Sequence, residues 1–208
     1  SKGHGVMAQY ACLYELGLLS DDDINNYFGD GTKLKGLSDS RVTGLEVSSG
    51  SLGHGLSVGV GLSLGIQLNK SDQKVFVIVG DGELNEGPCW EAIQFAGHHK
   101  LRNLFVIVDK NKYQAMGKTN EIINQENLHN QIESFGFEVK SIDGHDEKEI
   151  NLGIKELSES KTSKPKSIIA NTIKGKGISF MEDSNEWHYS RLTSSTFKTA
   201  LAELESEK

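Results

Sequence analysis

Four runs of Val, Ile and Phe residues constrain the fold of this 208-residue chain more than any other feature of its sequence. They occupy residues 74–79, 103–109, 137–142 and 167–173, and helix-like segments separate them. Nearly continuous apolar runs of this length are typical of parallel strands that are covered on both faces. The alternation of strand and helix predicts an α/β fold, in which a doubly wound parallel sheet carries helices on both faces.

The segments between these runs carry helix signals. Residues 87–99 open with Pro88, which suits the first turn of a helix. Residues 125–135 and 146–159 space apolar residues about one helical turn apart. Asp146 stands where a helix cap is expected. Each segment therefore predicts a helix that packs on the sheet.

The first third of the chain has a different character. Residues 5–17 and 52–68 predict helices, and the polar segment 21–40 between them reads as a loop. The second of these helices is rich in glycine, so we expect it to be buried and closely packed against its neighbours. Residues 194–208 predict a surface helix. Because no repeat or interdomain linker is visible, residues 1–208 are predicted to form a single domain.

The composition narrows the range of partners. The formal net charge is −7, which argues against nucleic acid or an anionic membrane surface as the main partner. No apolar run approaches the ~18 residues that a membrane-spanning helix needs, and no signal peptide is visible. Two cysteines give no disulfide framework, so we expect a cytoplasmic protein. To bind an anionic ligand, such an acidic chain would need a local source of positive charge, for example a metal ion or helix N-termini.

A carboxylate between two glycines follows the first predicted strand, in Gly80-Asp81-Gly82, and Asn111 follows the second strand. Ligands of open parallel sheets bind beyond the carboxyl ends of the strands. The glycines allow a sharp turn and close approach to a ligand, while the carboxylate and amide oxygens suit Mg²⁺ or Ca²⁺. Two side chains are too few to enclose a metal, so water, backbone carbonyls and phosphates of a ligand would complete the site. The alternative is a tight turn with a solvated Asp and an unrelated Asn.

The spacing of Asp81 and Asn111 resembles the diphosphate-binding signature of thiamine diphosphate enzymes. Further motifs resemble those of the transketolase family, in the order in which the family carries them, and cover nearly the whole chain. The resemblance is closest to the N-terminal subunit of split transketolases. The motifs are "SKGHG", "GLEVSSGSLGHGLSVGVG", "GDGELNEGPCWEA", "VDKNKYQAMG", "FGFEVKSIDGHD" and "TIKGKGISFMEDSNEWH".

The resemblance implies roles for individual residues. Asp81 and Asn111 would bind the metal through their side chains, and Tyr113 through its backbone carbonyl. Gly82 would offer a backbone N–H to the diphosphate. The other matched positions are Gly80, Gly50 and Leu52, which would contact the cofactor, and His4, His188 and Glu86, which would take part in catalysis. Both histidines would also lie near the diphosphate, and Glu86 would couple paired active sites across an interface.

The resemblance also implies an activity and a partner. The enzyme would transfer a two-carbon ketol unit from a ketose or ketose phosphate to an aldose, using thiamine diphosphate and Mg²⁺ or Ca²⁺. This chain would be the diphosphate-binding domain. A second subunit would supply the pyrimidine-binding domain and the activating glutamate, in an α₂β₂ assembly. Two departures from the family stand out: His54 replaces the usual Gln, and no GHxGG-type element precedes "SKGHG", so the domain is expected to lack its N-terminal segment or to be naturally short.

Other interpretations stay open at this point. The chain could belong to a different thiamine diphosphate enzyme, similar to deoxyxylulose-phosphate synthase or a 2-oxoacid dehydrogenase, or be a non-catalytic homologue. It could also be a magnesium-dependent phosphatase or a nucleotide-binding protein, although no P-loop and no G-x-G-x-x-G after a strand are present. Lys174 and Lys176 could attract a phosphate or lie in a solvated loop. The identities of the sugars are not specified by the sequence.

Overall fold

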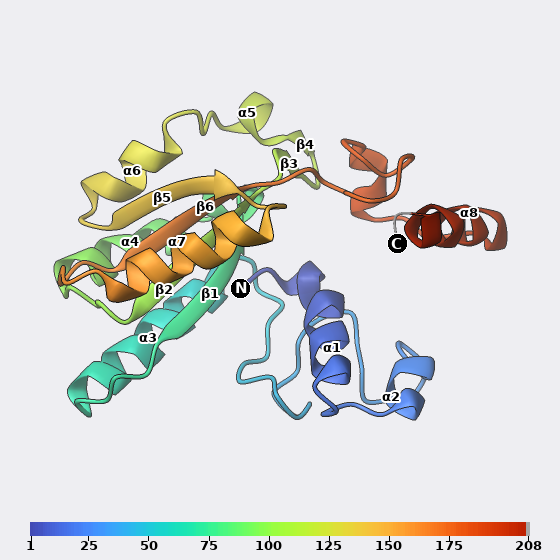
Figure 1. Cartoon of the computed structure of the whole chain (residues 1–208), viewed down its shortest axis with the longest axis horizontal. Coiled ribbons are helices and arrows are strands. Elements are labelled where there is room, and N and C mark those ends of the chain that lie inside the picture. The colour runs from blue at the N-terminus through green and yellow to red at the C-terminus, as the bar shows by residue number, and fades with distance from the viewer. Residues whose placement is uncertain (207–208) are drawn as a thin grey trace.

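Four parallel strands form the central sheet of the computed structural model, which describes residues 1–206 (Figure 1). The strand order is β1-β2-β6-β5, and all three pairings are parallel. The strands are Val75–Gly80 (β1), Leu104–Lys110 (β2), Glu138–Asp143 (β5) and Lys166–Asn171 (β6). Each corresponds to one of the predicted apolar runs, shifted by no more than one or two residues.

Helices cover both faces of this sheet, as expected for the doubly wound fold (Figure 1). Alternate residues of β2 supply the two cores, since Val106 packs on one face and Phe105 on the other. The helix on the Phe105 side is Glu147–Glu159 (α7), which packs on β5 and β6. The helices on the Val106 side are His54–Leu68 (α3), Gly87–His98 (α4) and Leu128–Ser134 (α6). The predicted fold class is therefore confirmed.

The helix signals read from the sequence are largely confirmed. Pro88 lies in the first turn of α4, and Asp146 caps α7 by accepting hydrogen bonds from the N–H groups of Lys148 (2.7 Å) and Glu149 (3.2 Å). α6 begins later than predicted, at Leu128. The C-terminal helix is Ser194–Ser206 (α8), and the last two residues of the predicted segment lie outside the described residues. Within the described part of the chain, no helix has both the length and the apolar character needed to cross a bilayer.

The prediction for the glycine-rich helix α3 is correct only in part. Gly59 allows the helix to lie against β1, because a Cβ there would overlap the side chain of Val77. Gly61 and Gly65, by contrast, have nothing within 4 Å of the corresponding Cβ position, and Leu62 is 46% exposed. The expectation of a fully buried helix was therefore wrong. The reason is that α3 lies at the edge of the sheet, where it packs on β1 and α4 with one side only.

An N-terminal lobe stands beside the sheet (Figure 1). It contains Val6–Glu15 (α1) and Asp21–Asn25 (α2), and has an apolar cluster of its own. The sequence analysis missed α2 within its polar segment. The missed signal is a capping box, in which Ser20 and Asp23 each accept the backbone N–H of the other.

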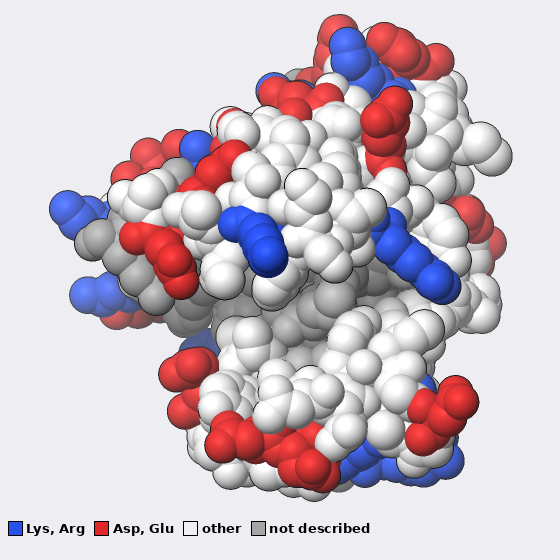
Figure 2. Space-filling view, turned by 90° about the vertical axis from the view of Figure 1, so that its right-hand side faces the viewer, with Lys and Arg blue, Asp and Glu red and all other residues white. Residues whose placement is uncertain are grey.

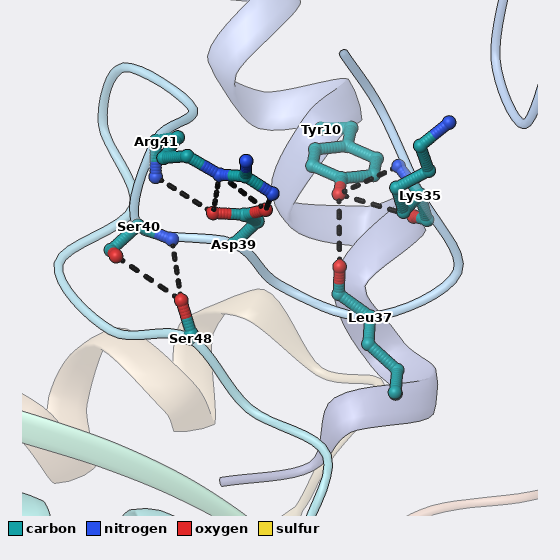
Figure 3. A network of polar contacts seen from close by, with 7 residues as sticks. All are labelled: Tyr10, Lys35, Leu37, Asp39, Ser40, Arg41 and Ser48. Atoms are coloured by element: carbon teal, nitrogen blue, oxygen red, sulfur yellow. Dashed lines mark hydrogen bonds and ion pairs between the residues drawn. The ribbon is translucent and has the colours of Figure 1, made fainter. Parts of the chain in front are cut away.

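Hydrogen bonds fasten the loop between α2 and α3 to α1 (Figure 3). The hydroxyl of Tyr10 lies 3.1 Å from the carbonyl oxygen of Lys35 and 3.3 Å from that of Leu37. Further along the loop, the N–H of Ser40 donates to the hydroxyl of Ser48 at 2.9 Å. This loop is therefore held in place before it reaches the start of α3.

Short elements complete the carboxyl edge of the sheet. A two-stranded antiparallel ribbon follows β2, and three 3₁₀ turns lie near the strand ends or the chain start. The elements are Gly3–Gly5 (η1), Gly82–Asn85 (η2), Tyr113–Gln114 (β3), Gly117–Lys118 (β4), Thr119–Ile122 (α5) and Asn185–His188 (η3).

The contact between α4 and the end of α6 provides a test of the packing. A Cβ at Gly97 would overlap the carbonyl oxygen of Phe135, so we expect Gly97→Ala to lower the free energy of unfolding by about 1–3 kcal/mol. Gly61→Ala in α3 is the matched control, because its Cβ meets no atom and the helix propensity gained is up to about 1 kcal/mol. Urea unfolding of both variants would measure the difference, and equal stabilities would contradict this packing.

Candidate active site

The carboxylate of Asp81 is buried at the end of β1, where the side chain is 1% exposed. Its Oδ1 accepts the N–H of Gly82 at 2.9 Å, and its Oδ2 accepts the N–H of Lys112 at 2.7 Å and the hydroxyl of Thr119 at 3.3 Å. Burial raises the pKa of this carboxyl, and the backbone N–H donors oppose the rise. Within residues 1–206, no Lys or Arg forms an ion pair with Asp81, so a bound cation would stabilise its ionised form.

The turn after β2 places Asn111 beside this carboxylate. Gly80 pairs with Asp109 in the parallel ladder, and the N–H of Asp81 donates to the carbonyl of Asp109 at 3.1 Å. Two residues later, the side-chain oxygen of Asn111 accepts the N–H of Tyr113 at 3.0 Å. Because Asp81 Oδ2 accepts the N–H of Lys112, the backbone between Asn111 and Tyr113 lies against the Asp81 carboxylate. Metal binding by these three residues stays a prediction.

The oxygens at this edge fit a hard divalent cation. Asp81 Oδ1 and Asn111 Oδ1 each accept a single hydrogen bond, which leaves each oxygen a free lone pair. Carboxylate and amide oxygens are ligands that Mg²⁺ and Ca²⁺ prefer. Within residues 1–206, no three His, Cys, Asp or Glu side chains are grouped as metal ligands. A metal here would therefore also draw on backbone, water or ligand oxygens.

The N–H of Gly82 donates to Asp81 Oδ1 at 2.9 Å, because Asp81 caps the η2 turn. The contact of this N–H with a diphosphate stays a prediction. What the glycine provides is space, since a Cβ at Gly82 would lie 2.5 Å from the Cβ of Gln114. The turn can therefore lie directly against the β3–β4 ribbon.

The backbone of this turn is also held by Gln125, which the sequence analysis missed. Gln125 is buried, and its Nε2 donates to the carbonyl of Asp81 at 2.7 Å and to Oδ1 of Asn85 at 3.1 Å. Asn85 in turn donates to the side chain of Gln114 at 3.1 Å. These amides fix the position of the Asp81 backbone relative to the ribbon.

Glu83 is a second residue that the sequence analysis missed. The side chain is 4% exposed and accepts the N–H groups of Gly53 (2.9 Å) and Gly80 (3.2 Å) and the hydroxyl of Ser1. Glu83 thereby joins the chain start, the turn before α3 and the end of β1. The local sequence offers one signal for the role of Glu83, its position directly after Gly80-Asp81-Gly82. Its partners Gly53 and Ser1 lie 30 and 82 residues away, so the sequence near Glu83 does not reveal them.

The structure brings His4 and His188 together, although they lie near opposite ends of the chain. Their ring centroids are 5.6 Å apart, and the rings meet edge to face. Burial lowers the pKa of His188, and the charges of Lys174, His4 and Lys2 lower it further, in that order. His188 is therefore favoured as a neutral imidazole, which can accept or donate a proton.

The remaining predicted site residues surround the start of α3. Gly50 and Leu52 lie exposed in the preceding loop, and His54 opens the helix with its Nδ1 3.3 Å from the carbonyl oxygen of Leu52. Gly53 has φ +83°, and a Cβ there would lie 2.8 Å from the Cβ of Glu86. Glu86 is half-buried at the first turn of α4. The structure therefore makes Glu86 a direct neighbour of the loop that was predicted to contact the cofactor.

A groove of about 990 Å³ runs between the N-terminal lobe, α3 and β1. Its floor includes Phe76 and Ile78, which are 48% and 50% exposed, and Lys2 and Asp109 also line it. Seen from the right-hand side of Figure 1, the surface of the molecule is hollowed at mid-height, with basic side chains beside the hollow and acidic side chains above and below it (Figure 2).

Comparison with known proteins identifies the family. The model of the transketolase thiamine diphosphate binding domain matches residues 1–205. The chain is 40% identical to an apulose-4-phosphate transketolase subunit from Actinobacillus succinogenes, over all 208 residues and 75% of that protein. It is 41% identical to 6-deoxy-6-sulfo-D-fructose transketolase subunit SqwG of Clostridium sp. (strain MSTE9), with the same coverage of both chains.

Solved structures agree with this result. Transketolase from Leishmania mexicana superposes on 98% of the chain with a TM-score of 0.88 and 30% identity. Transketolase from Campylobacter jejuni covers 90% of the chain, with a TM-score of 0.83 and 33% identity. The chain spans about a third of the length of each of these enzymes, 32% and 30%. The chain belongs to the transketolase family, whose thiamine diphosphate binding domain it matches over residues 1–205.

Proposed function

We propose that this chain anchors thiamine diphosphate through a divalent metal at the carboxyl edge of its sheet, as one subunit of a two-subunit transketolase. The observation that carries the proposal is the pair of oxygen donors on Asp81 and Asn111, held at neighbouring strand ends with a lone pair free on each. The match to a thiamine diphosphate binding domain supports the identity of the cofactor.

Different residues of this chain would bind the metal and the rings of the cofactor. Asp81, Asn111 and the carbonyl of Tyr113 would hold Mg²⁺ or Ca²⁺, whose charge offsets that of the diphosphate. Gln125 and the hydrogen bonds to Asp81 keep the ligand oxygens in place before the metal binds. Gly80 would leave the strand end accessible, while Gly50 and Leu52 would contact the cofactor rings. This arrangement explains how a chain of net charge −7 can hold an anionic cofactor.

His4 and His188 would assist proton transfer to and from the sugar substrate. When bound, thiamine diphosphate supplies a carbon nucleophile and an electron sink for cleaving the bond beside the ketose carbonyl. His188, neutral near pH 7, would accept or donate a proton at a sugar hydroxyl, and His4 at 5.6 Å would orient it. Glu86, which contacts the loop before α3, would connect this site to a second one across a subunit interface.

The substrates we propose are ketose donors that carry an anionic group. The two relatives described above are named for apulose-4-phosphate and 6-deoxy-6-sulfo-D-fructose, and these names denote a phosphate and a sulfonate. The second subunit would supply the pyrimidine-binding domain and the activating glutamate, in an α₂β₂ assembly. Support for this division comes from the relatives' names as subunits. The cytoplasmic location stays a prediction.

The division into two subunits can be tested by reconstitution. We expect no ketol transfer when this subunit is supplied with thiamine diphosphate, Mg²⁺, a phosphorylated ketose and an aldose acceptor. Adding the second subunit should produce turnover, because it completes the pocket around the cofactor. Activity of this subunit by itself would refute the proposed division, and an assay of the second subunit without this chain is the control.

The metal site can be tested by Asp81→Asn. Because this change removes the charged ligand from a buried site, we expect the Mg²⁺-dependent affinity for thiamine diphosphate to fall by at least about 100-fold. Asp72→Asn is the matched control, since the Asp72 side chain is 99% exposed, and its affinity should be unchanged. Isothermal titration of both variants, each checked for an unchanged circular dichroism spectrum, gives the comparison. Equal affinities would remove Asp81 from the site.

The lowered pKa of His188 sets the expected pH dependence. Its ordinary value is 6.5, so in the folded protein the imidazole is neutral at pH 7 and gains its proton only as the pH falls through a value below 6.5. The acidic limb of kcat/KM for the two-subunit enzyme should therefore lie below pH 6.5. Lys174→Met removes a neighbouring positive charge and should move this limb to higher pH. In a His188→Gln background this limb should be absent, whether or not Lys174 is changed.

A further inference from the structure

The turn between β5 and α7 lies directly against the end of β6. The N–H of Gly144 in this turn donates to the carbonyl of Asn171, the last residue of β6, at 2.8 Å. A Cβ at Gly144 would lie 2.5 Å from the side-chain methyl of Thr172, so this close approach requires a glycine. The turn can therefore bond to the chain at the point where it leaves the sheet.

His145, the next residue of this turn, accepts a hydrogen bond from that chain. Its Nε2 lies 2.8 Å from the nitrogen of Ile173, whose N–H donates to it. The N–H of His145 donates to Asp143 Oδ1 at 2.8 Å, and the N–H of Asp143 donates to Glu149 Oε2 in α7 at 2.8 Å. An imidazole can accept at Nε2 only when it is neutral and carries its proton on Nδ1. A series of hydrogen bonds thus runs from α7 through His145 to Ile173.

The residues that follow Ile173 form a closed loop, which we call the 174–183 loop. The N–H of Asp183 donates to the carbonyl of Lys174 at 3.0 Å and closes the loop at its base. Within the loop, Lys176 forms an ion pair with Glu182 at 3.5 Å. Because these bonds lie within the loop, they hold its shape, while its position depends on bonds to the rest of the molecule.

Two side chains outside the 174–183 loop hold its entry. Asp109, which forms an ion pair with Lys2, accepts the hydroxyl of Thr172. His145 holds the next residue, Ile173. The bond to His145 therefore acts on the residue immediately before the loop and sets the direction in which the chain leaves β6.

The exit of the 174–183 loop leads to His188. The side-chain amide of Asn185, the first residue of η3, donates to the carbonyl of Ala115 at 3.3 Å, and His188 ends η3 with its ring 5.6 Å from that of His4. Burial lowers the pKa of His188, and the charge of Lys174, the first residue of the loop, lowers it further. A shift of the loop entry would therefore change the surroundings of His188.

We propose that His145 is a positioning residue for His188. By accepting the N–H of Ile173, its imidazole fixes where the 174–183 loop begins, and so keeps Lys174 and His188 in the arrangement that the reaction uses. This inference rests on the proposed function, because it takes His188 to transfer protons at the sugar. The role requires a hydrogen-bond acceptor at residue 145 and no proton transfer by His145 itself.

The first test follows the titration of His188 by NMR in this subunit, without cofactor or second subunit. His145→Phe keeps a ring but loses the acceptor. The pKa of His188 should then rise toward 6.5 by about 0.3 unit or more, because the charge of Lys174 is held less closely to it. In His145→Gln, whose amide oxygen can replace Nε2, the pKa of His188 should stay at the wild-type value.

His129→Phe is the matched control for this titration. His129 is an exposed imidazole in α6, and its Nδ1 lies 3.1 Å from the hydroxyl of Ser141. Its replacement should leave the titration of His188 unchanged. An unchanged titration in His145→Phe would overturn the inference. An equal shift in His145→Gln would also overturn it, since the acceptor would then have no part in the effect.

The second test needs no variant and covers the case in which His145→Phe fails to fold. Long-range proton–nitrogen NMR spectra of the wild-type subunit distinguish the two neutral tautomers of an imidazole. They should show the proton of His145 on Nδ1, and the amide of Ile173 should exchange slowly with solvent. A proton on Nε2, which would prevent this nitrogen from accepting the N–H of Ile173, would overturn the inference.

Kinetics of the two-subunit enzyme separate this inference from the proposed function. His145→Phe should lower kcat by about 10-fold, because His188 is misplaced, and His145→Gln should restore most of the loss. If the wild-type pair of subunits shows no ketol transfer, the proposed function fails, while the titration of His188 still decides the role of His145. If the wild-type pair is active and His145→Phe has an unchanged kcat, the function stands and the role of His145 is overturned.

Discussion

The parallel pairing of β1, β2 and β6 is the constraint on which the candidate site depends. Because the three strands run the same way, their last residues meet at one edge, and Asp81 can bond to the backbone of Lys112 at 2.7 Å. The ladder between Gly80 and Asp109 fixes how far each strand end projects. A change of register by one residue would turn Asp81 to the other face of the sheet and remove it from the N–H groups that hold it. The chemistry proposed for this edge is therefore specified by strand register before any individual side chain is considered.

The sequence predicted the parts of the structure that have local causes. Continuous apolar runs located the strands, and Asp146 marked the start of α7. Asp81 and Asn111 could be paired in advance because strand ends in a parallel sheet converge. Glu83, Gln125 and the ion pair of Lys2 could not be found in the same way. Their partners lie 30 to 107 residues away, and such contacts leave no periodic pattern in the chain.

The exposed glycines of α3 are a second example of what the sequence does not predict. The glycines of α3 predicted close packing, and Gly59 confirms it. The face of α3 that meets the sheet, however, is decided by the elements that surround β1, and the sequence of the helix does not specify it. The electrostatics of the site also emerge only from the fold. A chain of net charge −7 gathers Lys2, Lys174 and two imidazoles at one edge, because β1, β6 and the chain start converge there. Counting charges along the sequence gives the wrong sign for this small region.

The bonds of Glu83 have a consequence for how the molecule folds. They close loops of 30 and 82 residues, and the entropy lost in closing a loop must be met before its contacts can contribute. The pairing of β1 with β2 joins residues such as Val75 and Leu104, so it closes a much shorter loop than the bond of Glu83 to Ser1 and can form earlier. The bond between the chain start and Glu83 is therefore expected to form late in folding. Weakening it would accelerate unfolding and leave the refolding rate nearly unchanged.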